Sequence, residues 1–220
     1  LLGSPLALGQ ALTSMKLWGQ WRGPLGTGVA PHGNPPVEWS ESKNVKWKTK
    51  LPGLGHSSPV VWGNLIFVTT AEGVGKRIPF TGFTPDGAHN NMDPVTVFQF
   101  AVIAVDLEKG SVVWRRTVAE YQPHQSTHET STWASNSPVT DGEHLFAFFG
   151  SNGLYCLDLG GRLVWEKDLG DMLVKHGHGE GASPALHDET LVVNWDHEGE
   201  SFIVAFSKRT GEELWRQPRD

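Results

Sequence analysis

Apolar residues along this chain come in short runs and not at the spacing of a helical face. Three runs, FAVIAVD (100–106), GLYCLD (153–158) and SFIVAF (201–206), are each about as long as one β-strand. Each leads into a turn that contains glycine, which reaches positive φ without steric cost, and a second extended segment follows. The pattern therefore predicts antiparallel hairpins and no long helix.

These hairpins are copies of one another. In each copy a glycine stands four residues before a tryptophan, and successive tryptophans are 51 and 50 residues apart. The pairs are Gly110 and Trp114, Gly161 and Trp165, and Gly211 and Trp215. A looser copy places Trp47 another 67 residues upstream. A fixed period of this length is typical of repeat architectures, and we predict that these glycines and tryptophans are structural residues of the repeat.

A second hairpin precedes each copy. The segments 58–70, 137–150 and 183–195 all open on Ser-Pro, turn, and resume in an apolar run. Proline is tolerated at the start of a strand because its missing N–H is not needed there. Each repeat therefore predicts four antiparallel strands, A to D, with tryptophan on strand D. Such a unit is one blade of an all-β propeller, and we expect blades at about 58–118, 137–168 and 183–216.

Composition narrows the class of protein. The 26 glycines and 14 prolines suit a chain with many turns. A net charge of −6 without a basic cluster argues against a nucleic-acid partner. The single cysteine, Cys156, lies in an apolar run, and its expected state is a buried, inert thiol. No segment reaches the roughly 20 apolar residues that a membrane-spanning helix needs.

The first 16 residues form a separate region. The segment LLGSPLALGQA is apolar and ends in small residues, as the tail of a secretory signal peptide does, with cleavage expected near Ala11. The alternative is a disordered N-terminus. The signal-peptide interpretation predicts a periplasmic or secreted protein.

Longer motifs carry a family resemblance. The opening Trp18-x-x-x-Arg22-Gly-Pro, the Ser-Pro hairpins and the Gly-x-x-x-Trp turns together resemble the PQQ-like β-propeller repeat family. This is the quinoprotein alcohol dehydrogenase-like superfamily, which includes the β-propeller lipoprotein of the outer-membrane β-barrel assembly machine. The family motif A-x-D-x-x-T-G-x-x-x-W fits best from Ala104 to Trp114. The second copy has Cys156 in place of the alanine, and the third has Ser207 in place of the aspartate.

The resemblance implies a ring of seven or eight blades in which the last blade takes one strand from the N-terminal end. The segment around Trp47 would be that donated strand. Residues 17–220 would then hold about half of a ring, with three full blades, and the remainder of its own chain would be needed to close it.

One face of the expected propeller is unusual. The connections between blades and between strands B and C emerge on this face, and here they are long, above all 71–97. Seven of the ten histidines, including His56 and His89, fall on them, whereas His32, His144 and His187 do not. We refer to this surface as the long-loop face. Our candidate binding residues on it are His124, His128, Trp133, His176, His178, Trp195, Asp196 and His197. The alternative is that histidines are frequent on this face only because most residues outside the strands lie there.

A metal centre is one possible use of these residues. His176, His178, Asp196 and His197 lie on adjacent loops, and imidazole with carboxylate suits a first-row divalent ion. Their spacing matches no zinc motif, and Asp196 begins an ordinary hairpin turn. We therefore predict no metal site.

Two functions follow from the resemblance. The first is a non-catalytic binding or scaffold module with a protein or polysaccharide partner, to which Trp133 and Trp195 would offer stacking surfaces; it needs no cofactor. The alternative is an oxidoreductase that uses pyrroloquinoline quinone with Ca²⁺. The resemblance associates that activity with an aspartate base and often with a vicinal cysteine pair, which one cysteine cannot form. A C-x-x-C-H haem site is absent as well.

Overall fold

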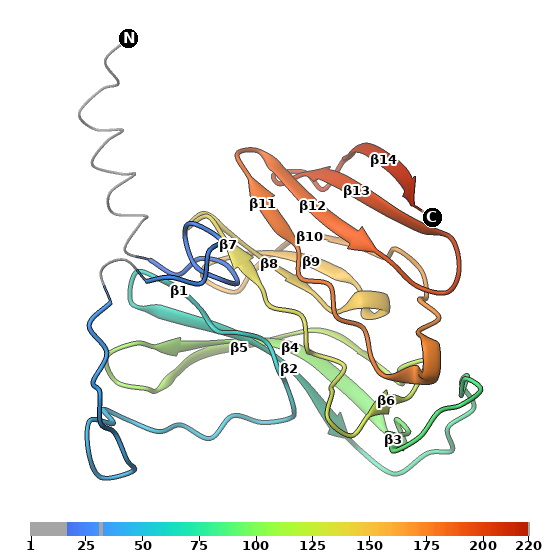
Figure 1. Cartoon of the computed structure of the whole chain (residues 1–220), viewed down its shortest axis with the longest axis horizontal. Coiled ribbons are helices and arrows are strands. Elements are labelled where there is room, and N and C mark those ends of the chain that lie inside the picture. The colour runs from blue at the N-terminus through green and yellow to red at the C-terminus, as the bar shows by residue number, and fades with distance from the viewer. Residues whose placement is uncertain (1–16, 31–32, 220) are drawn as a thin grey trace.

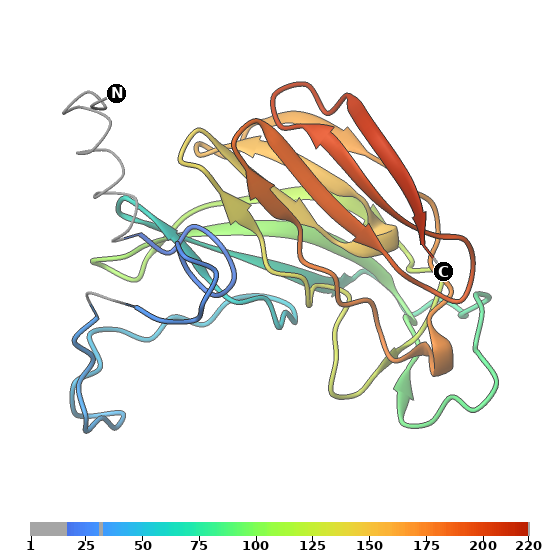
Figure 2. The ribbon, with the colours of Figure 1, turned by 45° about the horizontal axis from the view of Figure 1, so that its top comes forward.

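A computed structural model describes residues 17–30 and 33–219, so the expectations for residues 1–16 and for His32 lie outside the described residues. Three four-stranded antiparallel sheets lie side by side (Figures 1 and 2). This arrangement confirms the prediction of an all-β partial propeller of four-stranded blades. Among the described residues, no helix is long and apolar enough to cross a membrane.

Each sheet runs in chain order from its first strand to its last. The first blade holds β1 (Val60–Trp62), β2 (Leu65–Val74), β4 (Val97–Asp106) and β5 (Val112–Tyr121). The second holds β7 (Val139–Thr140), β8 (His144–Phe148), β9 (Leu154–Asp158) and β10 (Leu163–Lys167). The third holds β11 (Ala185–His187), β12 (Thr190–Trp195), β13 (Ser201–Ser207) and β14 (Glu213–Arg219). Two single-turn 3-10 helices, η1 (Gly150–Asn152) and η2 (Lys175–Gly177), lie in loops.

The middle blade contributes to both hydrophobic cores. Leu145 and Ala147 of β8 face the first blade, whereas Phe146 and Phe148 of the same strand face the third. Alternate residues of a strand point to opposite sides of the sheet, so a blade covered on both sides is apolar at every position. All five residues of β8 are accordingly buried. This is why its sequence reads as a continuous apolar run.

The strand-D tryptophans join the blades. The indole Nε1 of Trp114 donates to Leu159 O at 3.0 Å, and that of Trp165 donates to Lys208 O at 2.9 Å. Both acceptors lie in the C-to-D turn of the following blade. Trp47 makes the same contact with Leu107 O of the first blade, at 2.9 Å.

The repeated glycine provides the surface on which each indole lies. Gly161 has φ +87°, and a Cβ there would come within 2.9 Å of the Trp114 ring. Gly211 has φ +70°, and a Cβ there would lie 2.8 Å from Trp165. Glycine is therefore required both for the turn and for close approach of the indole. The Gly-x-x-x-Trp repeat is thus a docking contact between successive blades, with the glycine of one blade under the tryptophan of the blade before it.

The two ends of the stack differ. The segment around Trp47 pairs with no strand among the described residues, yet its indole occupies the docking position on Gly110. Trp215 is 46% exposed, and its neighbour Leu214 is 51% exposed. Strand β14 therefore exposes these two apolar side chains beside its charged residues.

The inner strands are linked by the Ser-Pro motifs. The backbone N–H of Ser58 donates to Ser137 Oγ, and that of Ser137 donates to Ser183 Oγ, each at 2.9 Å. These serines are equivalent in the three blades. The repeated serine thus connects each first strand to the next.

Candidate functional site

The insertion of the first blade folds over the loops between blades. This insertion, residues 75–96, connects β2 to β4. The first inter-blade loop is 122–138 and the second is 168–184. Strand β3 of the insertion (Asn91–Met92) pairs antiparallel with β6 (Thr127–His128) of the first loop. An isolated bridge also joins Phe83 to Gln125. Both views show β3 and β6 beside η2 of the second inter-blade loop, at the lower right (Figures 1 and 2). Three loops from different repeats therefore meet at one place.

Asn91 joins the insertion to the second inter-blade loop. Its Nδ2 lies 2.9 Å from the carbonyl oxygens of both His176 and Gly177 and 3.0 Å from Ser126 Oγ. His176 has φ 60°, a left-handed conformation that costs a residue other than glycine roughly 1–2 kcal/mol. A Cβ on Gly87 would lie 2.9 Å from His176 Nδ1. The backbone on both sides is thus shaped around the His176 side chain.

Four histidines meet where these loops cross. We refer to His89, His128, His176 and His178 as the four-histidine cluster. The ring centroid of His178 lies 4.9 Å from that of His89, 5.1 Å from that of His128 and 5.5 Å from that of His176. The His89 ring lies 5.9 Å from His128 and 6.4 Å from His176. Three of the four belong to the candidate set, and the insertion adds His89.

Two members of the cluster have a defined tautomer. His89 Nδ1 lies 3.0 Å from Gly87 O, and His176 Nδ1 lies 3.1 Å from Asp86 O. A carbonyl oxygen only accepts, so each Nδ1 carries a hydrogen. In the neutral ring, Nε2 then keeps its lone pair.

The other two members differ from these. His128 Nδ1 accepts the Thr130 N–H at 3.2 Å and lies 2.8 Å from Thr130 Oγ1, which favours a hydrogen on its Nε2. His178 Nε2 is buried and has no hydrogen-bond partner among the described residues. Desolvation by burial and the three neighbouring imidazoles lower the pKa of His178, which favours its neutral form.

A small cavity lies between the two inter-blade loops, and none of the four cluster histidines lines it. It measures about 20 Å³, room for about one water molecule, and His124, Trp133 and Glu180 are among the residues that line it. The Glu180 carboxylate accepts the backbone N–H and the hydroxyl of Ser151, each at 2.6 Å. Burial raises the pKa of Glu180. The carboxylate is therefore committed to η1 of the second blade, which it ties to the second inter-blade loop, rather than free for a ligand.

His124 and Trp133 are held by backbone carbonyls. His124 Nε2 lies 2.8 Å from Met172 O, and its Nδ1 lies 3.6 Å from the carboxylate of Asp171. The Trp133 indole donates to Gln125 O at 3.0 Å, and its ring lies 4.6 Å from that of Phe98. Both side chains fix the loop that carries them.

Trp195, Asp196 and His197 do not join the cluster. Trp195 is 2% exposed and stacks on Phe202 at 5.7 Å, so it offers no open surface for a sugar. Asp196 pairs with Arg219 at 3.2 Å. His197 Nδ1 accepts the Leu173 N–H at 3.1 Å. Our expectation that Trp195 forms a stacking surface is wrong, because it is a core residue of the third blade.

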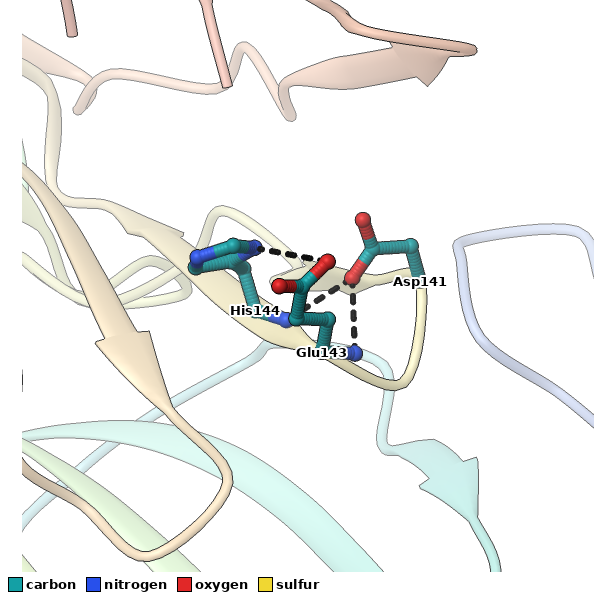
Figure 3. A group of neighbouring side chains, drawn as sticks. All are labelled: Asp141, Glu143 and His144. Atoms are coloured by element: carbon teal, nitrogen blue, oxygen red, sulfur yellow. Dashed lines mark hydrogen bonds and ion pairs between the residues drawn. The ribbon is translucent and has the colours of Figure 1, made fainter. Parts of the chain in front are cut away.

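A second polar group lies on the opposite face of the blades, where the short turns between strands A and B and between strands C and D emerge. We refer to it as the short-turn face, and the group lies in the turn between β7 and β8. The side chains of Asp141, Glu143 and His144 approach one another there, with ligand atoms within 4.8 Å (Figure 3). Asp141 Oδ1 accepts the backbone N–H groups of Glu143 and His144 at 2.9 and 2.8 Å. Its Oδ2 lies 2.9 Å from Lys208 Nζ. An ammonium already occupies the place that a metal cation would take, so this group stabilises a turn.

Sequence reasoning left His89 and Glu180 out of the candidate set. Both lie on the long loops, and the length of the insertion was the available signal for His89. The pairing of β3 with β6, which brings the insertion to His128, has no sequence signature because each strand has only two residues.

Comparisons with known proteins agree with this architecture. The chain is similar in fold to the quinohemoprotein alcohol dehydrogenase ADHIIG from Pseudomonas putida HK5, at 14% identity and a TM-score of 0.54. That match covers 99% of this chain and 28% of the dehydrogenase. BamB from Moraxella catarrhalis matches at 14% identity and a TM-score of 0.35, over 67% of this chain and 51% of BamB. No curated protein is similar enough in sequence to match.

A family model covers more than half of the chain. It is described as outer membrane protein assembly factor BamB, and it matches residues 99–220, from β4 of the first blade to the end of the third blade. The chain therefore belongs to the PQQ-like β-propeller family of the outer membrane protein assembly factor BamB.

Proposed function

We propose that this chain is an extracytoplasmic binding or scaffold module whose working surface is the long-loop face. The observation that carries the proposal is the folded insertion, residues 75–96, which is held on the inter-blade loops by β3–β6 pairing and by Asn91. The blades do not need it, because Val74 pairs directly with Val97 across its base. Long, ordered loops on a rigid scaffold are typical binding surfaces. The family's description as an outer membrane assembly factor supports a periplasmic location and a protein partner.

The hollows of the described residues do not suit pyrroloquinoline quinone. A tricyclic quinone with three carboxylates needs a large cavity with cationic groups. The cavity beside Glu180 measures only about 20 Å³ and has no lysine or arginine in its lining, and two larger hollows, of about 350 and 520 Å³, each have more carboxylates than lysines in theirs. Burial raises the pKa of the Cys156 thiol to about 12, so it stays protonated and unreactive. Likeness to the dehydrogenase at 14% identity concerns the fold alone.

The insertion can be removed to test the proposal. Replacing residues 75–96 by Asn-Gly would join β2 to β4 through a two-residue hairpin turn. We expect this variant to fold with the far-UV spectrum of the parent and to lose the partner recovered by cross-linking in a periplasmic extract. His187→Ala, at the exposed end of β11, should retain that partner.

Two results would contradict the proposal. One is equal recovery of the same partner by the parent and the variant that lacks the insertion. The other is a stoichiometric complex with pyrroloquinoline quinone and Ca²⁺ that oxidises alcohols in a dye-linked assay.

A further inference from the structure

The four-histidine cluster has the dimensions of a metal site. A zinc ion binds imidazole nitrogen at about 2.0–2.1 Å, so the ring centres of two tetrahedral ligands lie about 5 Å apart. His178 lies 4.9, 5.1 and 5.5 Å from the other three rings. Of the five ring separations given above, the largest, 6.4 Å between His89 and His176, exceeds this distance by about 1 Å.

The donor atoms are also suited to a metal. Carbonyl oxygens hold Nδ1–H of His89 and His176, which leaves Nε2 of each as a lone-pair donor. Such an outer hydrogen bond commonly fixes the tautomer and orientation of metal-bound histidine. Buried His178 Nε2 is an unpartnered polar atom, which is costly unless something satisfies it. A cation bound between the rings would coordinate the Nε2 atoms of His89, His176 and His178.

Within the described part of the chain, the hydrogen bonds of these rings go only to their own loops and to Asp86 O, and no ion pair involves them. The salt bridges of the described residues include none to these four rings. Four imidazoles this close cannot all be charged, because each proton disfavours the next. Meanwhile His176 keeps a left-handed backbone that Asn91 holds in place. The loops are therefore ordered around side chains that have no charged partner.

We propose that the four-histidine cluster binds one divalent transition-metal ion of the zinc class, with His89, His176 and His178 as ligands and His128 as the fourth. An all-imidazole set favours zinc, copper or nickel over calcium and magnesium, which prefer oxygen. The ring nitrogens do not yet converge: among the described residues only Asp141, Glu143 and His144 have ligand atoms within 4.8 Å of one another. Binding therefore requires the rings to rotate. It also requires His128 to change to its other tautomer.

The ion would tie three loops together. His89 comes from the insertion, His128 from the first inter-blade loop, and His176 and His178 from the second. Metal binding would thus rigidify the long-loop face. This inference does not depend on what that face binds.

Titration of the purified, EDTA-treated chain with Zn²⁺, and with Co²⁺ as a visible probe, tests the site. We expect one equivalent to bind, with a visible Co²⁺ spectrum of a nitrogen-ligated ion. His178→Ala and His89→Ala should each weaken Zn²⁺ binding by at least about 100-fold, and Asn91→Ala, which removes a positioning residue, by about tenfold. His89 is exposed, so its variant is expected to fold even if His178→Ala does not.

His187→Ala and His56→Ala are the matched controls, because both histidines are exposed and lie outside the cluster. Both should bind Zn²⁺ like the parent chain. The proposal is overturned if the parent binds no Zn²⁺ in the micromolar range, or if folded His89→Ala binds as tightly as the controls.

Discussion

The ion pairs of the short-turn face and the four-histidine cluster of the long-loop face hold polar side chains in different ways. On the short-turn face, acids and bases pair: Lys208 lies 2.9 Å from Asp141 and 3.1 Å from Glu189. On the long-loop face, the rings of the four-histidine cluster meet without a carboxylate partner among the described residues. The first arrangement satisfies charges and stabilises turns between blades. The second leaves donor atoms free at a crossing of three loops, which is what a ligand site requires.

The largest effect should come from the contact that joins the blades. Trp165→Ala removes an indole packed between the second and third blades and should lower the free energy of unfolding by about 3 kcal/mol. Trp215→Ala, its equivalent in the third blade, should cost under about 1 kcal/mol in the 220-residue chain, because that ring is 46% exposed. Urea unfolding of both variants measures the difference. Equal losses would contradict the docking role of Trp165.

The glycine under the indole offers a sharper version of this test. Gly161→Ala adds a methyl group 2.9 Å from the Trp114 ring at φ +87°. Gly63→Ala has the same left-handed strain, at φ +58°, but open space around it. We expect a loss of about 1 kcal/mol for Gly63→Ala and about 3 kcal/mol for Gly161→Ala, because only the second overpacks a contact. If the two variants unfold alike, close approach of the indole is not what the repeat glycine provides.

The ion pair between Lys208 and Asp141 should contribute less to the free energy of unfolding than the contacts between blades. Lys208→Met leaves the Asp141 carboxylate without its buried counter-charge and should lower the free energy of unfolding by about 2 kcal/mol. Arg162→Met removes an exposed pair with Asp158 and should change it by under about 0.5 kcal/mol. Thermal unfolding of both variants separates the buried pair from the exposed pair. If Arg162→Met loses as much stability as Lys208→Met, burial does not determine how much each ion pair contributes to the free energy of unfolding.

The Lys208–Asp141 pair also makes the free energy of unfolding depend on pH, and this is the smallest of the expected effects. Burial opposes ionisation of Asp141, but hydrogen bonds from His144, Lys208 and Glu143 outweigh it and lower the Asp141 pKa below its ordinary 3.8. A group with a lowered folded pKa contributes stability above its unfolded pKa and loses it as the pH falls through the folded value. The parent chain should therefore lose stability more steeply below about pH 4 than Lys208→Met does. Parallel slopes in urea unfolding between pH 5 and 2 would contradict this.

The repeat was predictable from sequence because its constraints are local. The alternation of strands, the Ser-Pro starts and the glycine four residues before tryptophan all lie within one blade. The site was only partly predictable. All four cluster histidines lie on loops that were recognised as unusual. Nothing in the sequence shows that the insertion with His89 reaches the inter-blade loops, because that contact depends on a two-residue strand pair, one isolated bridge and the hydrogen bonds of Asn91. Trp195 was misassigned because an aromatic residue at the end of a strand has the same local pattern whether it is buried or exposed.

Histidine side-chain nitrogen signals, measured by NMR during a Zn²⁺ titration, report the cluster and the short-turn face in one sample. We expect the signals of His89, His128, His176 and His178 to change together and to saturate at one equivalent of Zn²⁺. His144, in the paired group of the short-turn face, and exposed His187 should not respond. Changes at His144 before the cluster, or no change at the four rings, would contradict the distinction between the two faces.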